Sequence, residues 1–162
     1  MENKNPTALH LKEAAMSYFR YNRQWLCATE CLNKDVLVMT NKDFIEVEIK
    51  VSKSDLWNGE SKKFIHHQYK EPEKWAERYM LPNRYYICVP EYLLEEAKKW
   101  VQETNTKYGI LLYNNNSYQP LIVVKTAKVI HNRKQDKIER PIMMRICSEN
   151  ILHMRKNLRG EK

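Results

Sequence analysis

The chain has 162 residues, with 28 Lys or Arg against 20 Asp or Glu and a formal net charge of +8. This length suits one domain with a buried core, so we treat residues 1–162 as a single domain. No apolar stretch approaches the length of a membrane helix, and residues 1–6 lack the apolar run of a signal peptide. We therefore expect a cytoplasmic protein without a membrane partner. The positive charge favours a polyanionic partner such as nucleic acid.

Hydrophobic periodicity predicts alternating helices and strands along the chain. The first helix begins after Pro6, with Thr7 as its N-cap. A helical stretch covers residues 52–79, with expected interruptions at 58–59 and 71–73, and a turn is expected at 40–43. The other expected helices cover residues 7–21, 91–103 and 141–158, and the strands cover residues 25–32, 35–40, 44–51, 84–89, 108–113 and 121–125. This pattern predicts an α/β fold that ends in a basic helix.

The strand over residues 44–51 alternates apolar and charged side chains. Because successive side chains on a strand point to opposite faces, its apolar residues can face a core while Glu48 and Lys50 share the other face. A hairpin with the preceding strand would bring Asp35 near Glu48. Two carboxylates and an ammonium group would then lie at one point of the sheet.

These residue types suit metal-dependent hydrolysis of phosphodiester bonds. Mg²⁺ prefers hard oxygen ligands, so Asp35, Glu48 and the carbonyl of Ile49 are candidate ligands for Mg²⁺ or Mn²⁺. The ammonium group of Lys50 would orient the water or stabilise the charge of the transition state. The alternative interpretation is an ordinary ion pair between Glu48 and Lys50 on a half-exposed strand.

The order of helices and strands, together with two sequence motifs, resembles the restriction-endonuclease-like, or PD-(D/E)XK, nuclease superfamily. The segments Lys-Asp-Val-Leu-Val-Met at 34–39 and Val-Glu-Ile-Lys-Val-Ser-Lys-Ser-Asp-Leu at 47–56 are similar to motifs of its MmcB-like branch of DNA-repair and phage nucleases. The resemblance spans about residues 7–131. Lys34 replaces a small residue of the family pattern, and the proline of the superfamily name is absent.

The resemblance implies an αβββαβ core, with a mixed sheet flanked by helices, and an endonuclease that acts in DNA repair, recombination or phage DNA processing. It also makes Glu13, on the first helix, a candidate third catalytic carboxylate. An exposed partner of Lys12 or Arg20 is the other interpretation of Glu13, and Glu30 is a competing third carboxylate. By the same resemblance, Lys63 and Tyr69 are candidates near the cleft.

Basic residues form three groups that suit a DNA-binding surface. The first two supply the candidate contacts, and the third lies at the C-terminus. Of the adjacent histidines His66 and His67, only one can face the site from a helix, and a phosphate contact or a plain surface position are the alternatives. The candidate nucleic-acid contacts are Lys53, Lys62, Lys63, His66, Tyr69, Lys70, Lys125 and Lys128.

The four cysteines show none of the close pairs that are typical of zinc sites, so free and largely buried thiols are expected. Cys27 and Cys31 should share one face of their strand.

Two classes of function are compatible with these features: a Mg²⁺- or Mn²⁺-dependent DNA endonuclease, and an inactive nucleic-acid-binding module on the same fold. The sequence leaves open RNA as a substrate and a homodimer that would cut both strands.

Overall fold

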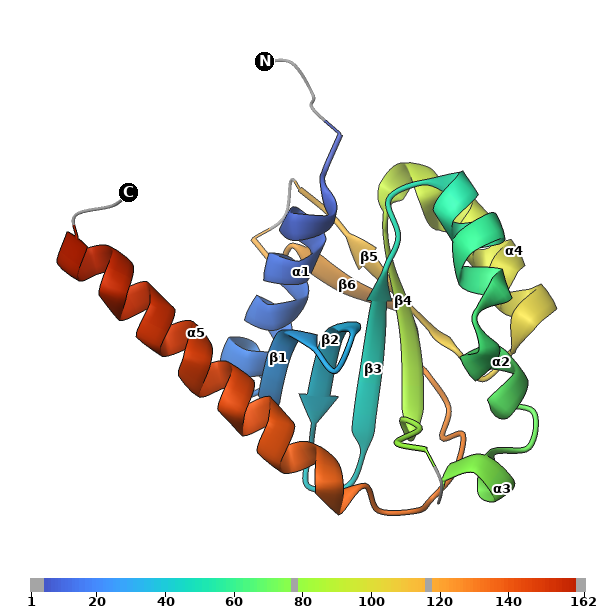
Figure 1. The fold of residues 1–162 in the computed structure, drawn as a ribbon. Helices are drawn as coiled ribbons and strands as arrows, with labels where there is room; N and C mark the ends of the chain where they lie inside the picture. The colour runs from blue at the N-terminus through green and yellow to red at the C-terminus, as the bar shows by residue number, and fades with distance from the viewer. Residues whose placement is uncertain (1–4, 77–78, 116–117, 160–162) are drawn as a thin grey trace.

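The computed structural model describes residues 5–76, 79–115 and 118–159. It has the expected α/β class: a six-stranded mixed sheet with helices on both faces (Figure 1). The strands are β1 (Leu26–Cys31), β2 (Lys34–Met39), β3 (Phe44–Ile49), β4 (Arg84–Pro90), β5 (Gly109–Tyr113) and β6 (Leu121–Lys125). They lie in the sheet in the order of the sequence.

The helices agree with the expected positions but are less regular than the periodicity suggested. The first is α1 (Ala8–Met16), which continues as the π-helix η1 (Ser17–Asn22). The stretch predicted as interrupted helix divides into η2 (Asp55–Gly59), η3 (Glu60–Lys62), α2 (Phe64–Gln68) and α3 (Pro72–Ala76). Three further elements are η4 (Glu91–Leu93), α4 (Leu94–Thr104) and η5 (Asp136–Ile138), and the last is α5 (Glu139–Arg159).

Because β3 and β4 are parallel, the C-terminal ends of these two strands lie side by side. β1, β2 and β3 pair antiparallel, β3, β4 and β5 pair parallel, and β6 returns antiparallel to β5. Glu48 of β3 lies beside Ile87 of β4, which lies beside Ile110 of β5. The expected turn between β2 and β3 is present, because Thr40 accepts hydrogen bonds from the amides of Lys42 and Asp43 through its hydroxyl.

Two buried clusters occupy the two faces of the sheet. On one face, α1 packs Leu11 and Ala15 against residues that include Val47 and Ile49 of β3. On the other face, α4, the segment 56–76 and Leu81 pack around Tyr85 of β4. Ile45, Val47 and Ile49 of β3 lie in the first cluster, whereas Phe44, at the start of the strand, packs in a third cluster with Leu37 and Ile142. Beyond Phe44, the other face of β3 carries the charged side chains of Glu46 and Glu48.

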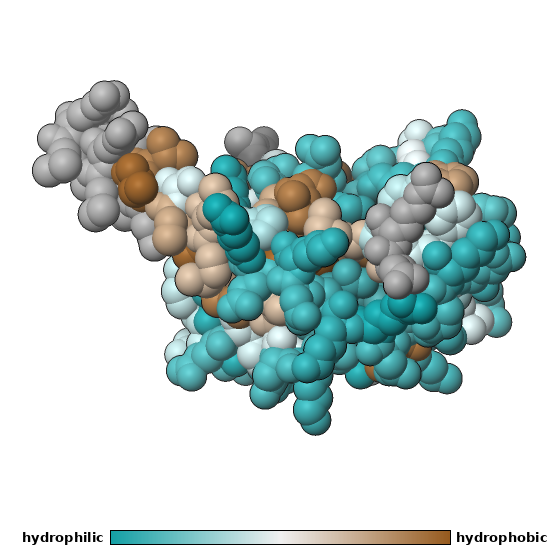
Figure 2. Space-filling model, turned by 60° about the horizontal axis from the view of Figure 1, so that its bottom comes forward, coloured by the Kyte–Doolittle hydropathy of each residue, from teal (hydrophilic) through white to brown (hydrophobic). Residues whose placement is uncertain are grey.

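The C-terminal helix α5 packs against β1 and then projects from the body of the molecule (Figure 1). Its first half buries Ile142 beside Leu37 of β2, and Arg145 donates a hydrogen bond to the carbonyl of Thr29 at 3.0 Å. Apolar side chains gather toward the projecting end of this helix, while the rest of the visible surface is mainly hydrophilic (Figure 2). Ile151 and Leu152 are 48% and 52% exposed.

The four cysteines are free, as predicted, and three of them are buried. The expectation that Cys27 and Cys31 share a face was wrong, because Cys27 belongs to the α1 cluster and Cys31 to the α5 cluster. Glu30, between them, has a φ of 50°, and this left-handed conformation interrupts the alternation of the strand. None of the helices in the described ranges is both long enough and apolar enough to cross a membrane.

Candidate active site

The charged face of β3 is buried. Glu46, Glu48 and Lys50 alternate with the core residues Val47 and Ile49, as the sequence predicted, and are 1%, 5% and 5% exposed. The ion pair expected in the alternative interpretation, between Glu48 and Lys50, is present. The expected half-exposed setting was wrong, because η2, η3 and α2 cover this face of the sheet. Burial makes each unpaired charge here costly, so the arrangement of partners is strongly constrained.

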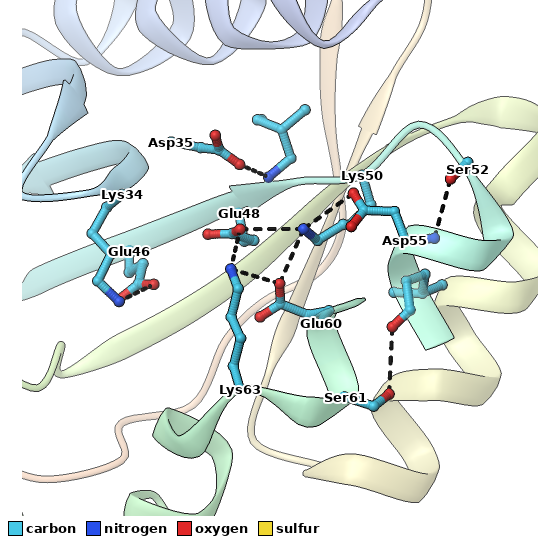
Figure 3. A network of polar contacts seen from close by, with 12 residues as sticks. Lys34, Asp35, Glu46, Glu48, Lys50, Ser52, Asp55, Glu60, Ser61 and Lys63 are labelled. Carbon is cyan, nitrogen blue, oxygen red and sulfur yellow. Dashed lines mark hydrogen bonds and ion pairs between the residues drawn. The ribbon is translucent and has the colours of Figure 1, made fainter. Parts of the chain in front are cut away.

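Asp35 reaches the same part of β3. The register pairs Val36 with Val47, so the next positions along the ladder are Asp35 and Glu48. Asp35 Oδ2 accepts a hydrogen bond from the backbone amide of Ile49 at 2.9 Å (Figure 3), and Asp35 Oδ1 lies 2.9 Å from the ammonium group of Lys12 on α1. The predicted proximity of Asp35 to the Glu48 strand is thus confirmed.

Two lysines lie between the carboxylates of Glu48 and Glu60 (Figure 3). Lys50 Nζ is 3.2 Å from Glu48 Oε1, 3.1 Å from Glu60 Oε2 and 3.3 Å from Asp55 Oδ2. Lys63 Nζ contacts the same oxygen of Glu48 and lies 2.9 Å from Glu60 Oε2. The lysines and carboxylates alternate, so each positive charge has at least two negative neighbours.

Glu60 connects this network to the aromatic core behind it. Its second oxygen, Oε1, accepts a hydrogen bond from the Tyr85 hydroxyl at 2.6 Å and lies 2.9 Å from His66 Nε2. His66 Nδ1 lies 2.7 Å from the hydroxyl of Tyr108. One oxygen of Glu60 is therefore held by the core, and the other faces the two lysines.

The pKa values of Glu48 and Glu60 are shifted in opposite directions. Burial, together with the charges of Glu60 and Asp35, raises the pKa of Glu48 above its usual range. Burial also acts to raise the pKa of Glu60, but hydrogen bonds from His66, Tyr85 and Lys63 outweigh it and hold that pKa below its usual range. Of the two glutamates, Glu48 is therefore the one whose ionised form an additional positive charge would stabilise more.

A third glutamate on this face, Glu46, pairs with Lys34 at the start of β2. Lys34 Nζ lies 2.8 Å from Glu46 Oε1, whereas Glu46 Oε2 is buried and finds no hydrogen-bond partner among the described residues. Burial raises the pKa of Glu46 to about 7, although Lys34 opposes the shift.

The first helix turns Lys12, and not Glu13, toward the site. Lys12 contacts both Glu30 and Asp35, whereas Glu13 is exposed and belongs to none of these contacts. One residue corresponds to about 100° around an α-helix, so Lys12 and Glu13 point in clearly different directions. Of the two candidate third carboxylates, Glu30 shares the ammonium group of Lys12 with Asp35, whereas Glu13 does not.

Two predicted nucleic-acid contacts are buried and cannot lie on a DNA-binding surface. His66 and Tyr69 are 7% and 3% exposed, and both pack in the aromatic cluster around Tyr85. As expected, only one of the adjacent histidines enters the site: His66 is buried and His67 is exposed. Within the described ranges, the buried Tyr69 hydroxyl has no hydrogen-bond partner.

The predicted lysine contacts fall into different environments. Lys62, Lys70 and Lys128 are exposed, and Lys53 is exposed but lies 2.6 Å from Glu96. Lys125 donates hydrogen bonds to the carbonyls of Thr106 and Tyr108. Burial and the charge of Lys128 lower the pKa of Lys125.

Sequence reasoning missed Lys12, Asp55 and above all Glu60. Asp55 lies within the motif that carried the family resemblance, but Glu60 follows a broken helix and no periodicity points to its direction. The only signal for Glu60 is an acidic residue close to Lys62 and Lys63 in an otherwise basic segment.

The oxygen donors of Asp35 and Glu48 fit a divalent cation of the magnesium type. Glu48 Oε1 holds both lysines, whereas no described residue donates to Glu48 Oε2. Across the described ranges, no group of three or more His, Cys, Asp or Glu side chains is arranged to hold a metal ion. A cation would therefore be held by these two carboxylates together with water and substrate oxygens, which is a common arrangement for Mg²⁺.

Comparisons with protein-family models, curated proteins and solved structures gave no match for this chain.

Proposed function

We propose that this chain is a metal-dependent nuclease that hydrolyses phosphodiester bonds in DNA. The observation that carries the proposal is the meeting of Asp35 with the Glu48 strand, beside two ammonium groups in a largely buried network. Perturbed carboxylates that lie together with positively charged groups are typical of catalytic sites.

In this proposal, Asp35 and the free oxygen of Glu48 hold Mg²⁺ or Mn²⁺, and the carbonyl of Ile49 is a further candidate ligand. The bound ion would activate a water molecule and polarise the phosphoryl group. The protein fixes Asp35 through the amide of Ile49 and fixes Glu48 through Lys50 and Lys63. An ammonium group at the site stabilises negative charge on the phosphate.

The positive charge of the chain would attract the DNA backbone. Exposed lysines near the site, Lys62 and Lys70, supply this attraction close to the carboxylates. We place the reaction in DNA repair, recombination or phage DNA processing, as the family resemblance implies.

A second candidate is an inactive nucleic-acid-binding module. The observation in its favour is that lysines already neutralise both carboxylates: Lys12 pairs with Asp35, and Lys50 and Lys63 pair with Glu48. In such a module, the lysines would replace a metal ion permanently.

A cleavage assay separates the two candidates. Single-stranded, duplex, nicked and branched DNA, with single-stranded RNA as a further substrate, would be incubated with the protein and Mn²⁺, Mg²⁺ or EDTA. The nuclease proposal predicts metal-dependent cleavage that Glu48→Gln abolishes and that the exposed control Glu13→Gln retains. Binding without cleavage of any substrate would favour the inactive module.

A further inference from the structure

Lys50 and Lys63 share the same carboxylates but differ in exposure. The side chain of Lys50 is 6% exposed and lies between Glu48, Asp55 and Glu60, whereas that of Lys63 is 39% exposed. A substrate phosphate can contact only an ammonium group that solvent also reaches. In this arrangement Lys63 meets that condition and Lys50 does not.

Lys63 also lines a surface depression next to the site. The depression has a volume of about 320 Å³ and lies between the segment 61–70 and the end of α4. Lys62, Lys63 and Lys70 contribute positive charge to it, and Glu103 contributes one negative charge. Neither Lys62 nor Lys70 forms an ion pair with any residue in the described ranges. The depression therefore has a net positive charge. Lys63 connects it to the candidate site, because its ammonium group contacts Glu48.

We propose that Lys63 is the residue that contacts the substrate phosphate, in a phosphate-binding subsite completed by Lys62 and Lys70, and that Lys50 and Glu60 are positioning residues. This inference rests on the proposed function and transfers to Lys63 the phosphate contact that the sequence suggested for Lys50. The ligand is a phosphate oxyanion, which either a strand end or the backbone within a strand can supply.

Glu60 gives Lys63 its position. Lys63 lies between η3 and α2, and its own backbone is extended (φ −64°, ψ 131°). Its long side chain would move freely in solvent without an anchor, but Glu60 Oε2 lies 2.9 Å from its ammonium group. Because Tyr85 and His66 hold the other oxygen of Glu60, this anchor is fixed to β4 and α2. Lys50 has a different task, which is to neutralise carboxylates in the interior.

The test combines binding without metal and cleavage with metal. A fluorescein-labelled oligonucleotide, with either a phosphate or a hydroxyl at its 5′ end, would be titrated in EDTA, and single-turnover cleavage would be measured with Mn²⁺. The variants are Lys63→Gln, Lys63→Arg and Glu60→Gln. Lys98→Gln is the matched control, because Lys98 is a lysine of similar exposure (47%) that pairs with Glu95 and does not line the depression. Circular dichroism would show that each variant is folded.

We expect Lys63→Gln to weaken binding several-fold and to slow cleavage by about 100-fold, the scale for loss of one electrostatic contact to the transition state. Lys63→Arg should recover much of both, since it keeps the charge. Glu60→Gln should slow single-turnover cleavage while binding in EDTA stays within a few-fold of wild type, because the lysine remains but is no longer held. Discrimination between the 5′ ends would assign the subsite to a strand end, and equal binding would assign it to backbone phosphates.

Equal binding and equal cleavage by Lys63→Gln and Lys98→Gln would overturn the inference while leaving the nuclease proposal intact. If the wild type binds but does not cleave, the nuclease proposal fails, and weaker binding by Lys63→Gln would still support the subsite. Absence of binding by the wild type would reject both.

Discussion

Alternation on β3 is the residue-scale feature from which the candidate site could be predicted. A period of two places Glu48 and Lys50 on the face opposite Ile49, and the structure agrees. Burial of that face could not be predicted in the same way, because its cover comes from short helical segments whose orientation no periodicity fixes. For the same reason the sequence did not predict the buried positions of Glu60, His66 and Tyr69.

Removal of the Lys50 ammonium group should destabilise the fold. In Lys50→Ala, three carboxylates lose the buried positive charge that they share. Loss of one partner from a buried ion pair costs about 3–5 kcal/mol, so we expect the free energy of unfolding in urea to fall by about this amount. Lys53→Ala, at an exposed ion pair, is the control and should change it little. Equal stabilities would mean that Lys50 is solvated in solution.

Thiol reactivity tests the burial of individual cysteines. Burial raises the pKa of Cys27 to about 12 and that of Cys88 further, so the thiolate forms of both are scarce near pH 8. Cys147 is exposed. We expect the native protein to react quickly with one equivalent of a thiol reagent, at Cys147, and Cys147→Ser to remove that phase. Fast modification of Cys27 or Cys88 would contradict the described core.

At the scale of elements, the order of helices and strands followed from periodicity and turn residues, but their exact form did not. The helix expected over residues 52–79 is divided into four pieces, and only two of its breaks were anticipated, at 58–59 and 71–73. The additional break at Lys63 matters most, since its extended backbone lets the side chain reach Glu48. Tertiary contacts with the aromatic cluster, which a local pattern does not contain, fix this segment.

The docking of α5 on β1 depends on a short apolar contact. Ile142 is fully buried against β1 and β2, whereas Met144, on the same helix, is 60% exposed. We expect Ile142→Ala to lower the free energy of unfolding by about 2–5 kcal/mol, and Met144→Ala to change it much less. Denaturant unfolding of the two variants makes the comparison. A larger effect at Met144 would show that the outer face of α5 is covered in solution.

At the scale of the whole molecule, net charge predicted a polyanionic partner but not which lysines face it. Lys125 was a candidate contact, yet it donates its hydrogen bonds to backbone carbonyls, whereas the side chains of Lys62 and Lys70 have no such partners in the part of the chain that the structure describes. The net charge is a sum over all charged residues. Only the fold distinguishes lysines that bind backbone carbonyls from lysines that can bind phosphate.

Salt dependence should reveal this difference. Binding to duplex DNA should weaken steeply between about 50 and 200 mM salt, because each phosphate contact releases counterions. Replacing Lys62 and Lys70 together by Gln should flatten the slope of the logarithm of the binding constant against that of the salt concentration. Lys125→Gln should leave the slope almost unchanged. The reverse pattern would place the DNA-binding surface beside β6.

The central claim, a divalent cation held by Asp35 and Glu48, can be measured directly by thermal melting in EDTA and in Mn²⁺. A ligand that binds only the folded state adds about 2.7 kcal/mol at 100 times its Kd, which raises the melting temperature of a domain of this size by several degrees. Wild type and the exposed control Glu13→Gln should show this rise. Asp35→Asn should lose most of it while melting in EDTA close to wild type, because the change removes both attraction to Lys12 and repulsion from Glu48. Equal Mn²⁺ shifts in wild type and Asp35→Asn would contradict the proposed site.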